Sequence, residues 1–205
     1  MKRDINIAVL VSGGGTNLAA LIGAEKSGDL HSGKLALVVS NKADAYALQR
    51  AADAGIPTAV VQRKIFADKA AFEDAILAVL DEHHIDMIVL AGFMCILSER
   101  FTRRYDKRIL NVHPSLIPSF CGEGFYGLKV HEAALEYGVK VTGATVHFVN
   151  EVPDGGEIIL QKAVEILPDD TPETLQRRVM EQAEWKILPQ ATELVAAKLA
   201  KEKDV

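Results

Sequence analysis

The sequence is poor in cysteine and lacks long apolar runs. Its two cysteines, Cys95 and Cys121, are too few for a disulfide scaffold and are expected to be free thiols. No apolar run approaches the roughly 20 residues that span a bilayer. The N-terminal residues Met1-Lys2-Arg3-Asp4 do not resemble a secretory signal. We therefore expect a cytoplasmic protein with no membrane partner.

Basic clusters and metal-ligand patterns are also missing. Lys and Arg total 23 against 28 Asp and Glu, which gives a net charge of −5, and no Lys/Arg tract stands out. Nucleic acid is therefore not an expected partner. No Cys/His/Asp cluster has the spacing of a metal site, and neither a Walker loop nor a Gly-x-Ser-x-Gly sequence occurs. We expect no bound metal, and any anion must be held by loop amides and a few side chains.

What the sequence does contain is an alternation of apolar strands and helices. Strands are predicted at 5–11, 35–39, 58–61, 86–91 and 109–112, with helices at 17–26, 45–54 and 66–83. Uninterrupted Val/Ile/Leu strands separated by helices indicate a mostly parallel, doubly wound, Rossmann-like α/β sheet covered on both faces. In such sheets ligands bind at the carboxyl ends of the strands.

The C-terminal part follows a different pattern. A helix at 128–137 precedes two long strands, 141–149 and 158–166, which predict an antiparallel hairpin at the edge of the sheet. Thr171 and Pro172 then begin a long final helix, because Thr is a good N-cap and Pro suits the first helical position. No composition shift marks a second domain, so we expect a single domain over residues 1–205.

A glycine-rich loop, Ser12-Gly13-Gly14-Gly15-Thr16-Asn17, joins the first strand to the first helix. Free backbone N–H groups and the helix dipole favour a phosphate at such a position. The dinucleotide fingerprint is not met, since Leu18 occupies the third glycine position and Ser40-Asn41 ends the second strand. The loop therefore predicts a monophosphate site. The alternative is a tight turn that needs glycine only for its backbone geometry.

Asn111 and His113 end an apolar strand, where alternate side chains point the same way. An amide and an imidazole so placed can donate two hydrogen bonds to one developing oxyanion. A carboxylate from the later Asp154-Gly155-Gly156 turn can orient the ring, and we expect it to raise the pKa of His113. This combination indicates chemistry at a carbonyl carbon. The alternative is a structural Asn, a buried His and an ordinary turn residue.

Six motifs occur together and in order: SGGGTNL (12–18), AGFM (91–94), ILS (96–98), NVHPSLIPSF (111–120), TVHFV (145–149) and DGG (154–156). With these motifs the chain resembles the phosphoribosylglycinamide formyltransferases, folate-dependent enzymes of purine synthesis, from Ile5 to about Pro189. The resemblance implies transfer of a formyl group from 10-formyltetrahydrofolate to the amino group of glycinamide ribonucleotide. It also implies a mononucleotide-binding half at 1–112 and a catalytic, folate-binding half at 113–205.

The resemblance further implies a role for individual residues. The catalytic residues would be Asn111, His113 and Asp154. The ribonucleotide would be bound by Gly15, Thr16, Asn17 and Glu184. The folate would be bound by Lys69, Met94, Cys95, Ile96, Leu97, Asn111, Asn150, Glu151, Val152, Pro153 and Asp154. For Glu184, the residues alone leave a substrate contact and an ordinary surface charge equally open.

At two positions this sequence differs from the family. Lys69 and Cys95 stand where relatives have arginine, so no arginine side chain can contact the folate at either position. A cis peptide is expected before Pro118, and the glycines of the loop 121–127 suggest a mobile flap.

The sequence leaves three alternative functions. A formyltetrahydrofolate hydrolase would pass the formyl group to water, but such relatives carry an N-terminal regulatory domain. A methionyl-tRNA formyltransferase would need a basic tRNA-binding extension. A mononucleotide-binding module would leave the Asn, His and Asp without a role. We expect the two small-molecule substrates as partners of a monomer or homodimer.

Overall fold

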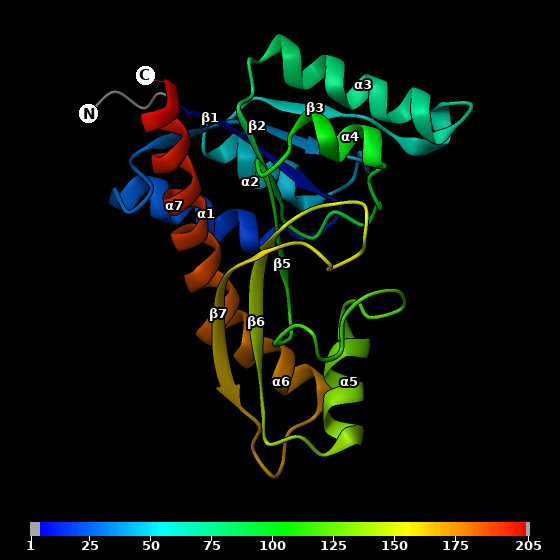
Figure 1. Cartoon of the computed structure of the whole chain (residues 1–205), viewed down its shortest axis with the longest axis vertical. Coiled ribbons are helices and arrows are strands. Elements are labelled where there is room, and N and C mark those ends of the chain that lie inside the picture. Colours follow the sequence, from blue (N-terminus) through cyan, green and yellow to red (C-terminus); the bar gives the residue numbers. More distant parts are fainter. Residues whose placement is uncertain (1–4, 204–205) are drawn as a thin grey trace.

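A seven-stranded sheet forms the centre of the computed structural model, which describes residues 5–203 (Figure 1). The sheet order is β3-β2-β1-β4-β5-β6-β7. The strands are β1 (Ile5–Val11), β2 (Gly33–Ser40), β3 (Thr58–Val60), β4 (Met87–Leu90), β5 (Ile109–His113), β6 (Val141–Phe148) and β7 (Ile158–Glu165). Strands β1 to β5 pair in parallel, whereas β6 is antiparallel to both β5 and β7. The predicted parallel sheet with an antiparallel hairpin at its edge is confirmed.

Helices cover both faces of the sheet. They are α1 (Thr16–Ser27), α2 (Tyr46–Asp53), α3 (Lys69–Glu82), α4 (Glu99–Arg104), α5 (Leu128–Tyr137), α6 (Pro172–Val179) and α7 (Trp185–Lys203). Ile7 and Val9 of β1 pack in one core with α1, α2, α6 and α7, while Ala8 and Leu10 pack in the other with α3 and α4. In Figure 1, α1 and α7 accordingly lie apart from α3 and α4. Because both faces are covered, β1 is a continuous apolar run rather than an alternating one.

The helix boundaries show where local chemistry overrides apolar spacing. Helix α3 begins at Lys69 rather than at Phe66, because the Asp68 side chain accepts a hydrogen bond from the N–H of Ala71 (2.8 Å) and caps the helix. The short helix α4 was not predicted. Its six residues are too few to show a helical period, although Ser98 caps it in the usual way.

The long final helix begins with the predicted Thr171 cap and Pro172. It continues to the end of the described chain, but Met180–Glu184 form a π-helical segment between α6 and α7. Within residues 5–203, no helix is both long and apolar enough to cross a membrane.

Candidate active site

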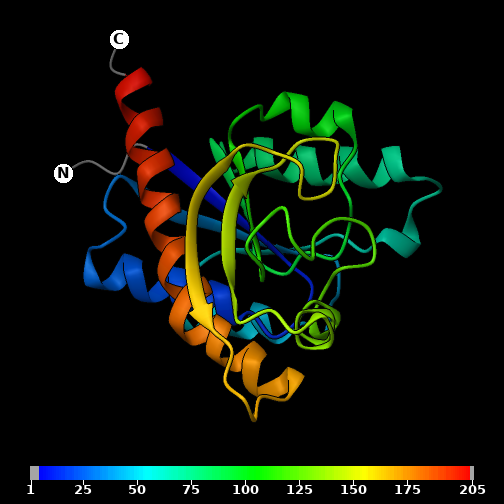
Figure 2. The ribbon, with the colours of Figure 1, turned by 60° about the horizontal axis from the view of Figure 1, so that its bottom comes forward.

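A cleft of about 880 Å³ opens at the carboxyl ends of β1, β4 and β5. Its walls come from segments far apart in the sequence, between Thr16 after β1 and Glu184 before α7. Two long connections form its outer side: the segment between β5 and α5, and the turn between β6 and β7. Figures 1 and 2 show these two segments, green and yellow, projecting from the same part of the molecule. The expected convergence on the carboxyl ends of the strands is therefore present.

The glycine loop forms one end of the cleft. Gly15 adopts a left-handed backbone (φ 71°), and a Cβ atom there would lie 2.7 Å from the Cβ of Ala47. Only glycine fits both constraints. Helix α1 then begins at Thr16 with no side-chain cap, so the N–H groups of its first turn are available to an anion. Arg50 fixes the loop from α2 by donating to the carbonyl of Gly14 (2.9 Å).

Glu184 approaches the same end from the π-helical segment. Its carboxylate is buried, and Oε2 accepts a hydrogen bond from Asn17 Nδ2 at 2.8 Å. Burial raises the pKa of Glu184, although the bond from Asn17 partly opposes this effect. The surface-charge alternative for Glu184 is therefore wrong. Inserted π turns often occur at functional sites, and this one carries a buried carboxylate to the start of α1.

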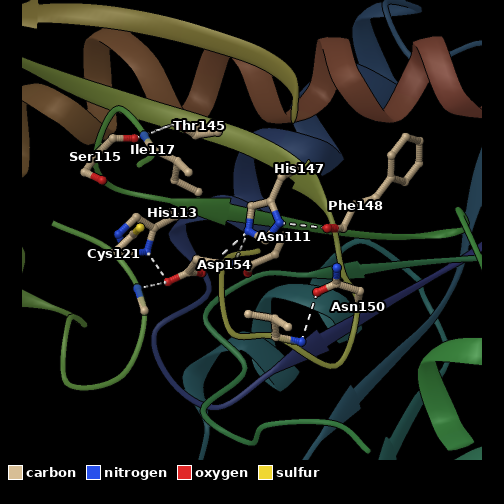
Figure 3. Close-up of polar contacts among 12 residues, drawn as sticks. Asn111, His113, Ser115, Ile117, Cys121, Thr145, His147, Phe148, Asn150 and Asp154 are labelled. Carbon is tan, nitrogen blue, oxygen red and sulfur yellow. Dashed lines mark hydrogen bonds and ion pairs between the residues drawn. The ribbon is translucent and has the colours of Figure 1, made fainter. Parts of the chain in front are cut away.

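Asn111 and His113 lie on the same face of β5, as the alternation of the strand predicts. The antiparallel register sets Asn111 opposite His147 of β6, and Asn111 Nδ2 lies 3.3 Å from His147 Nε2. Figure 3 shows the Asp154 carboxylate between His113 and the Asn111–His147 pair. Asp154 Oδ2 is 3.4 Å from His113 Nδ1, and Oδ1 is 3.6 Å from His147 Nε2. The three predicted catalytic side chains are thus brought together.

The backbone of the β6–β7 turn explains how Asp154 reaches this point. Asp154 adopts a left-handed conformation (φ 56°), which Asp tolerates better than most residues. A Cβ atom on Gly156 would lie 1.7 Å from the carbonyl oxygen of Phe148, so the turn can close only with glycine there. The N–H of Gly122 donates to Asp154 Oδ2 at 2.9 Å and ties the turn to the segment after β5.

The pKa of His113 is lower than that of free imidazole, although Asp154 acts to raise it, as expected. Burial is the largest cause, and it outweighs the Phe120 carbonyl and Asp154, which both favour the charged ring. Burial also acts to raise the pKa of Asp154. The His147 ring, with Nε2 3.6 Å from Oδ1, the hydrogen bond from Gly122 and the nearby charge of His113 more than compensate, so this pKa falls below its ordinary range. The unliganded site therefore pairs an ionised Asp154 with a His113 that resists protonation.

The predicted folate segments form another part of the cleft wall. Met94, Cys95, Ile96 and Leu97 follow β4 and line it, as do Asn150, Val152 and Pro153 of the β6–β7 turn. The N–H of Met94 donates to the buried Ser12 hydroxyl (2.9 Å), which links this segment to the glycine loop. Met94 and Ile96 expose large apolar side chains, as a site for a flat aromatic ligand requires.

Gly15, Lys69 and Glu151 do not line the cleft, whereas the other predicted site residues do. Lys69 lies in the first turn of α3, with Nζ 3.8 Å from Glu73. Cys95 does line the cleft, and its sulfur accepts a hydrogen bond from Asn41 Nδ2 (3.1 Å). The expected cis peptide is present between Ile117 and Pro118.

Sequence reasoning gave no role to several residues of the cleft wall, among them His147, Lys129, Gln176 and Met180. For His147 a signal was available: it shares a strand face with Thr145 and falls opposite Asn111 once the hairpin register is set. Among the residues that the structure describes, no group of three or more His, Cys, Asp or Glu is arranged to hold a metal ion.

Comparison with known proteins agrees with this geometry. Residues 5–192 match the formyl transferase family. The phosphoribosylglycinamide formyltransferase of Haemophilus influenzae is 49% identical over 183 residues, which are 89% of this chain and 83% of that protein. The human trifunctional purine biosynthetic protein adenosine-3 is 47% identical over 96% of this chain, but the match covers 19% of that protein. The chain therefore spans about a fifth of the length of its trifunctional relatives.

Solved structures give the same result. The phosphoribosylglycinamide formyltransferase of Brucella melitensis superposes with a TM-score of 0.86 and 46% identity, covering 96% of this chain and 97% of that one. The glycinamide ribonucleotide transformylase 1 of Symbiobacterium toebii gives a TM-score of 0.89 with 40% identity, covering 97% of this chain and 90% of that one. The family match over residues 5–192 and the likeness of the folds agree: the chain belongs to the formyl transferase family.

Proposed function

We propose that this protein transfers the formyl group of 10-formyltetrahydrofolate to the amino group of glycinamide ribonucleotide, a step of purine biosynthesis. The observation that carries the proposal is one cleft that joins an uncapped helix N-terminus to the Asn111, His113 and Asp154 side chains. The names of the Haemophilus and Brucella relatives support it. Full activity is proposed for this chain by itself, although it spans only part of its trifunctional relatives.

The two ends of the cleft suit the two substrates. The phosphate would accept hydrogen bonds from the N–H groups at the start of α1, around Thr16 and Asn17. Gly15 would act through its backbone conformation, and Glu184 would contact the same substrate from the π-helical segment. The folate would lie along residues 94–97 and the turn 150–154. Lys69 and Glu151 do not line the cleft, so neither side chain belongs to the wall that would face the folate.

The site would catalyse the reaction by stabilising negative charge on the formyl oxygen. When the substrate amine attacks the formyl carbon, Asn111 Nδ2 and a protonated His113 Nδ1 donate to the developing oxyanion. The loss of one such donor typically costs on the order of 3 kcal/mol, or 10²–10³ in rate. A new bond joins the amine nitrogen to the formyl carbon, and the bond from that carbon to the folate nitrogen breaks. No covalent bond to the protein is required.

Proton transfer follows from the lowered pKa of His113. In the unliganded protein the ring is neutral near pH 7, so it can accept the proton of the bound ammonium group. That single transfer creates both a nucleophilic amine and an imidazolium donor. Asp154, ionised because its own pKa is lowered, stabilises the imidazolium. It can relay the second proton, which the attacking nitrogen loses as it becomes an amide, through water to the leaving folate nitrogen, and His113 returns the first proton to solvent after the reaction.

An assay with 10-formyltetrahydrofolate, with and without glycinamide ribonucleotide, tests the proposal. Transfer predicts that tetrahydrofolate forms only when the ribonucleotide is present. Tetrahydrofolate formed without the ribonucleotide would show that the protein hydrolyses the formyl-folate. No product under either condition would indicate a protein that binds ligands without catalysis. Both of these outcomes would overturn the proposed function.

The proposal includes a cytoplasmic location and a monomeric or homodimeric state with small-molecule partners. Cys95 and Cys121 are both free thiols in the structure, which suits a reducing compartment. Light scattering coupled to gel filtration would give the oligomeric state, and a mass above that of two chains would contradict this part of the proposal.

A further inference from the structure

A short backbone segment, residues 120–122, contacts both members of the His113–Asp154 pair. The carbonyl oxygen of Phe120 lies 2.8 Å from His113 Nε2. The N–H of Gly122 donates to Asp154 Oδ2, the same oxygen that faces His113 Nδ1. Neither contact uses a side chain of the segment, so its backbone path alone determines both contacts.

The contact with Phe120 fixes the proton arrangement of the ring. A carbonyl oxygen can only accept a hydrogen bond, so Nε2 of His113 must carry the hydrogen. The neutral ring then has its lone pair on Nδ1, the nitrogen beside Asp154. Protonation of Nδ1 would convert it into a donor to the developing oxyanion, with the Asp154 carboxylate 3.4 Å away as its counter-charge, while Nε2 stays bonded to Phe120. This tautomer is the one that the proposed proton transfer requires.

Phe120 reaches this position through an unusual backbone conformation. Its φ is 48°, in the left-handed region that non-glycine residues rarely adopt. Its ring packs edge-on against Phe125 (centroids 6.4 Å apart) and Tyr137 (6.0 Å). Strain of this kind persists only where neighbouring contacts hold it, and such sites are often functional. The two ring contacts connect the segment to the loop 121–127 and to α5.

We propose that Phe120 is a positioning residue for catalysis: its ring anchors the segment so that its carbonyl holds His113 in the Nε2–H tautomer with Nδ1 free for the reaction. This inference rests on the proposed function and deepens it. It also connects the loop 121–127 with the catalytic ring, because displacement of Phe120 releases His113 Nε2.

Other charged or titratable groups also face His113. Asp154 lies beside Nδ1, His147 approaches from β6 and His131 from α5. Asp154 and the Phe120 carbonyl favour the charged ring, whereas His147 and His131 disfavour it. Loss of the Phe120 contact therefore lowers the pKa of His113 further. The acidic limb of the pH–activity profile, which the protonation of His113 controls, then moves to lower pH.

Phe120→Gly and Phe120→Tyr test this role. Glycine removes the ring and frees the backbone, whereas tyrosine keeps the ring contacts. Leu194→Ala serves as the control, because Leu194 is an exposed apolar residue on α7 that does not line the cleft. The tautomer is read from ¹⁵N NMR of histidine-labelled protein without substrates, and kcat and KM are measured separately across pH.

In the wild type, Phe120→Tyr and Leu194→Ala, neutral His113 should carry its hydrogen on Nε2 alone. In Phe120→Gly both tautomers should appear and kcat should fall about tenfold, with the KM for the ribonucleotide within about twofold. Hydrogen on Nδ1 in the wild type, or an unchanged tautomer in Phe120→Gly whatever its kcat, would overturn the inference. If the wild type transfers no formyl group, the proposed function fails while the NMR result still decides the role of Phe120.

Discussion

At the scale of single residues, the carboxylate of Asp154 is the most tightly constrained group of the site. One oxygen accepts from the Gly122 N–H and faces His113, and the other faces His147. These contacts keep its pKa below the ordinary range, so it is ionised throughout the pH range in which a ribonucleotide amine can be deprotonated. Its function would depend on charge as well as on position.

Asp154→Asn should remove that charge while keeping an oxygen that can accept from Gly122. We expect kcat to fall by about 10²-fold or more, because the His113 imidazolium loses its counter-charge. The KM for the ribonucleotide should change less than twofold, since the phosphate end of the cleft is untouched. Steady-state kinetics from pH 5 to 9 would measure both values. Asp44→Asn, at an exposed position, is the control, and full turnover in Asp154→Asn at every pH would contradict the assigned role.

His131 of α5 is a second buried imidazole, and we expect it to affect the pH dependence of stability. It is fully buried, and neither ring nitrogen has a hydrogen-bond partner among the described residues. Burial, with a smaller effect of His113, lowers its pKa from 6.5 to about 4. Below about pH 6.5 His131 binds a proton in the unfolded chain, whereas in the folded chain it binds that proton only below about pH 4. Stability is therefore lost as the pH falls through this window.

His131→Met should remove that pH dependence and fill the same space with an apolar side chain. The variant should gain up to about 3 kcal/mol in unfolding free energy relative to the wild type between pH 7.5 and pH 4.5. Urea unfolding at the two pH values gives the difference. An identical loss of stability in both proteins over this range would show that His131 does not cause it.

Sequence reasoning succeeded at single residues where side-chain direction follows from local structure. The alternation of β5 is enough to place Asn111 and His113 on one face. It predicted that Asp154 raises the pKa of His113, but not that burial outweighs this effect, because burial depends on the hairpin and on the segment after β5, which are distant in the sequence. Asp154 was found through its motif, since its left-handed conformation has no clear local signal.

At the scale of elements, the start of α1 is the feature on which phosphate binding would depend. Gly15→Ala should strain the left-handed backbone and press a methyl group against Ala47. We expect a loss of about 1–3 kcal/mol in unfolding free energy and at least a tenfold rise in the KM for the ribonucleotide. Thermal unfolding and steady-state kinetics would measure the two effects.

Gly23→Ala provides the matched control within the same helix. Nothing lies within 4 Å of a Cβ atom at Gly23, and its backbone is helical. This variant should be stabilised by about 0.4–1 kcal/mol with an unchanged KM. If both variants changed the KM equally, the special role of the uncapped helix start would be wrong.

Elements with strong periodicity were predicted well, and those governed by caps or by packing were not. Helix α5 begins and ends at the predicted residues, 128 and 137. The π-helical segment at Met180–Glu184 was invisible, because the extra residue per turn results from tertiary packing rather than from a sequence pattern. The resemblance therefore identified Glu184, but the sequence could not say that its carboxylate is buried.

At the scale of the whole molecule, the cleft joins both halves of the chain. We propose that residues 1–205 act as a single domain, since one sheet runs through both predicted halves, 1–112 and 113–205. The walls include Thr16 and Met94 from the first half and Asp154 from the second, so the predicted division does not separate the two substrate sites. The sequence predicted most of the elements and the meeting of Asn111, His113 and Asp154, but not the short helix α4 or the position of His147 beside Asp154.

A cleft built in this way should couple ligand binding to global stability. Ribonucleotide at about 100 times its Kd should raise the free energy of unfolding by about 2.7 kcal/mol. Differential scanning fluorimetry would detect this as a rise in Tm. At the same ligand concentration the rise should be about halved in Gly15→Ala if its Kd is tenfold higher. An unchanged Tm for the wild type under the same conditions would contradict ribonucleotide binding by the folded cleft.

The most direct test of the central claim follows the formyl carbon itself. Enzyme in excess is mixed with glycinamide ribonucleotide and 10-formyltetrahydrofolate that carries ¹³C in the formyl group, and the reaction is quenched over one turnover for mass spectrometry. The account predicts that all of the label appears on the ribonucleotide amine, in step with tetrahydrofolate release and with none on the protein. Label recovered as formate, or bound covalently to the chain before the product forms, would contradict direct transfer in this cleft.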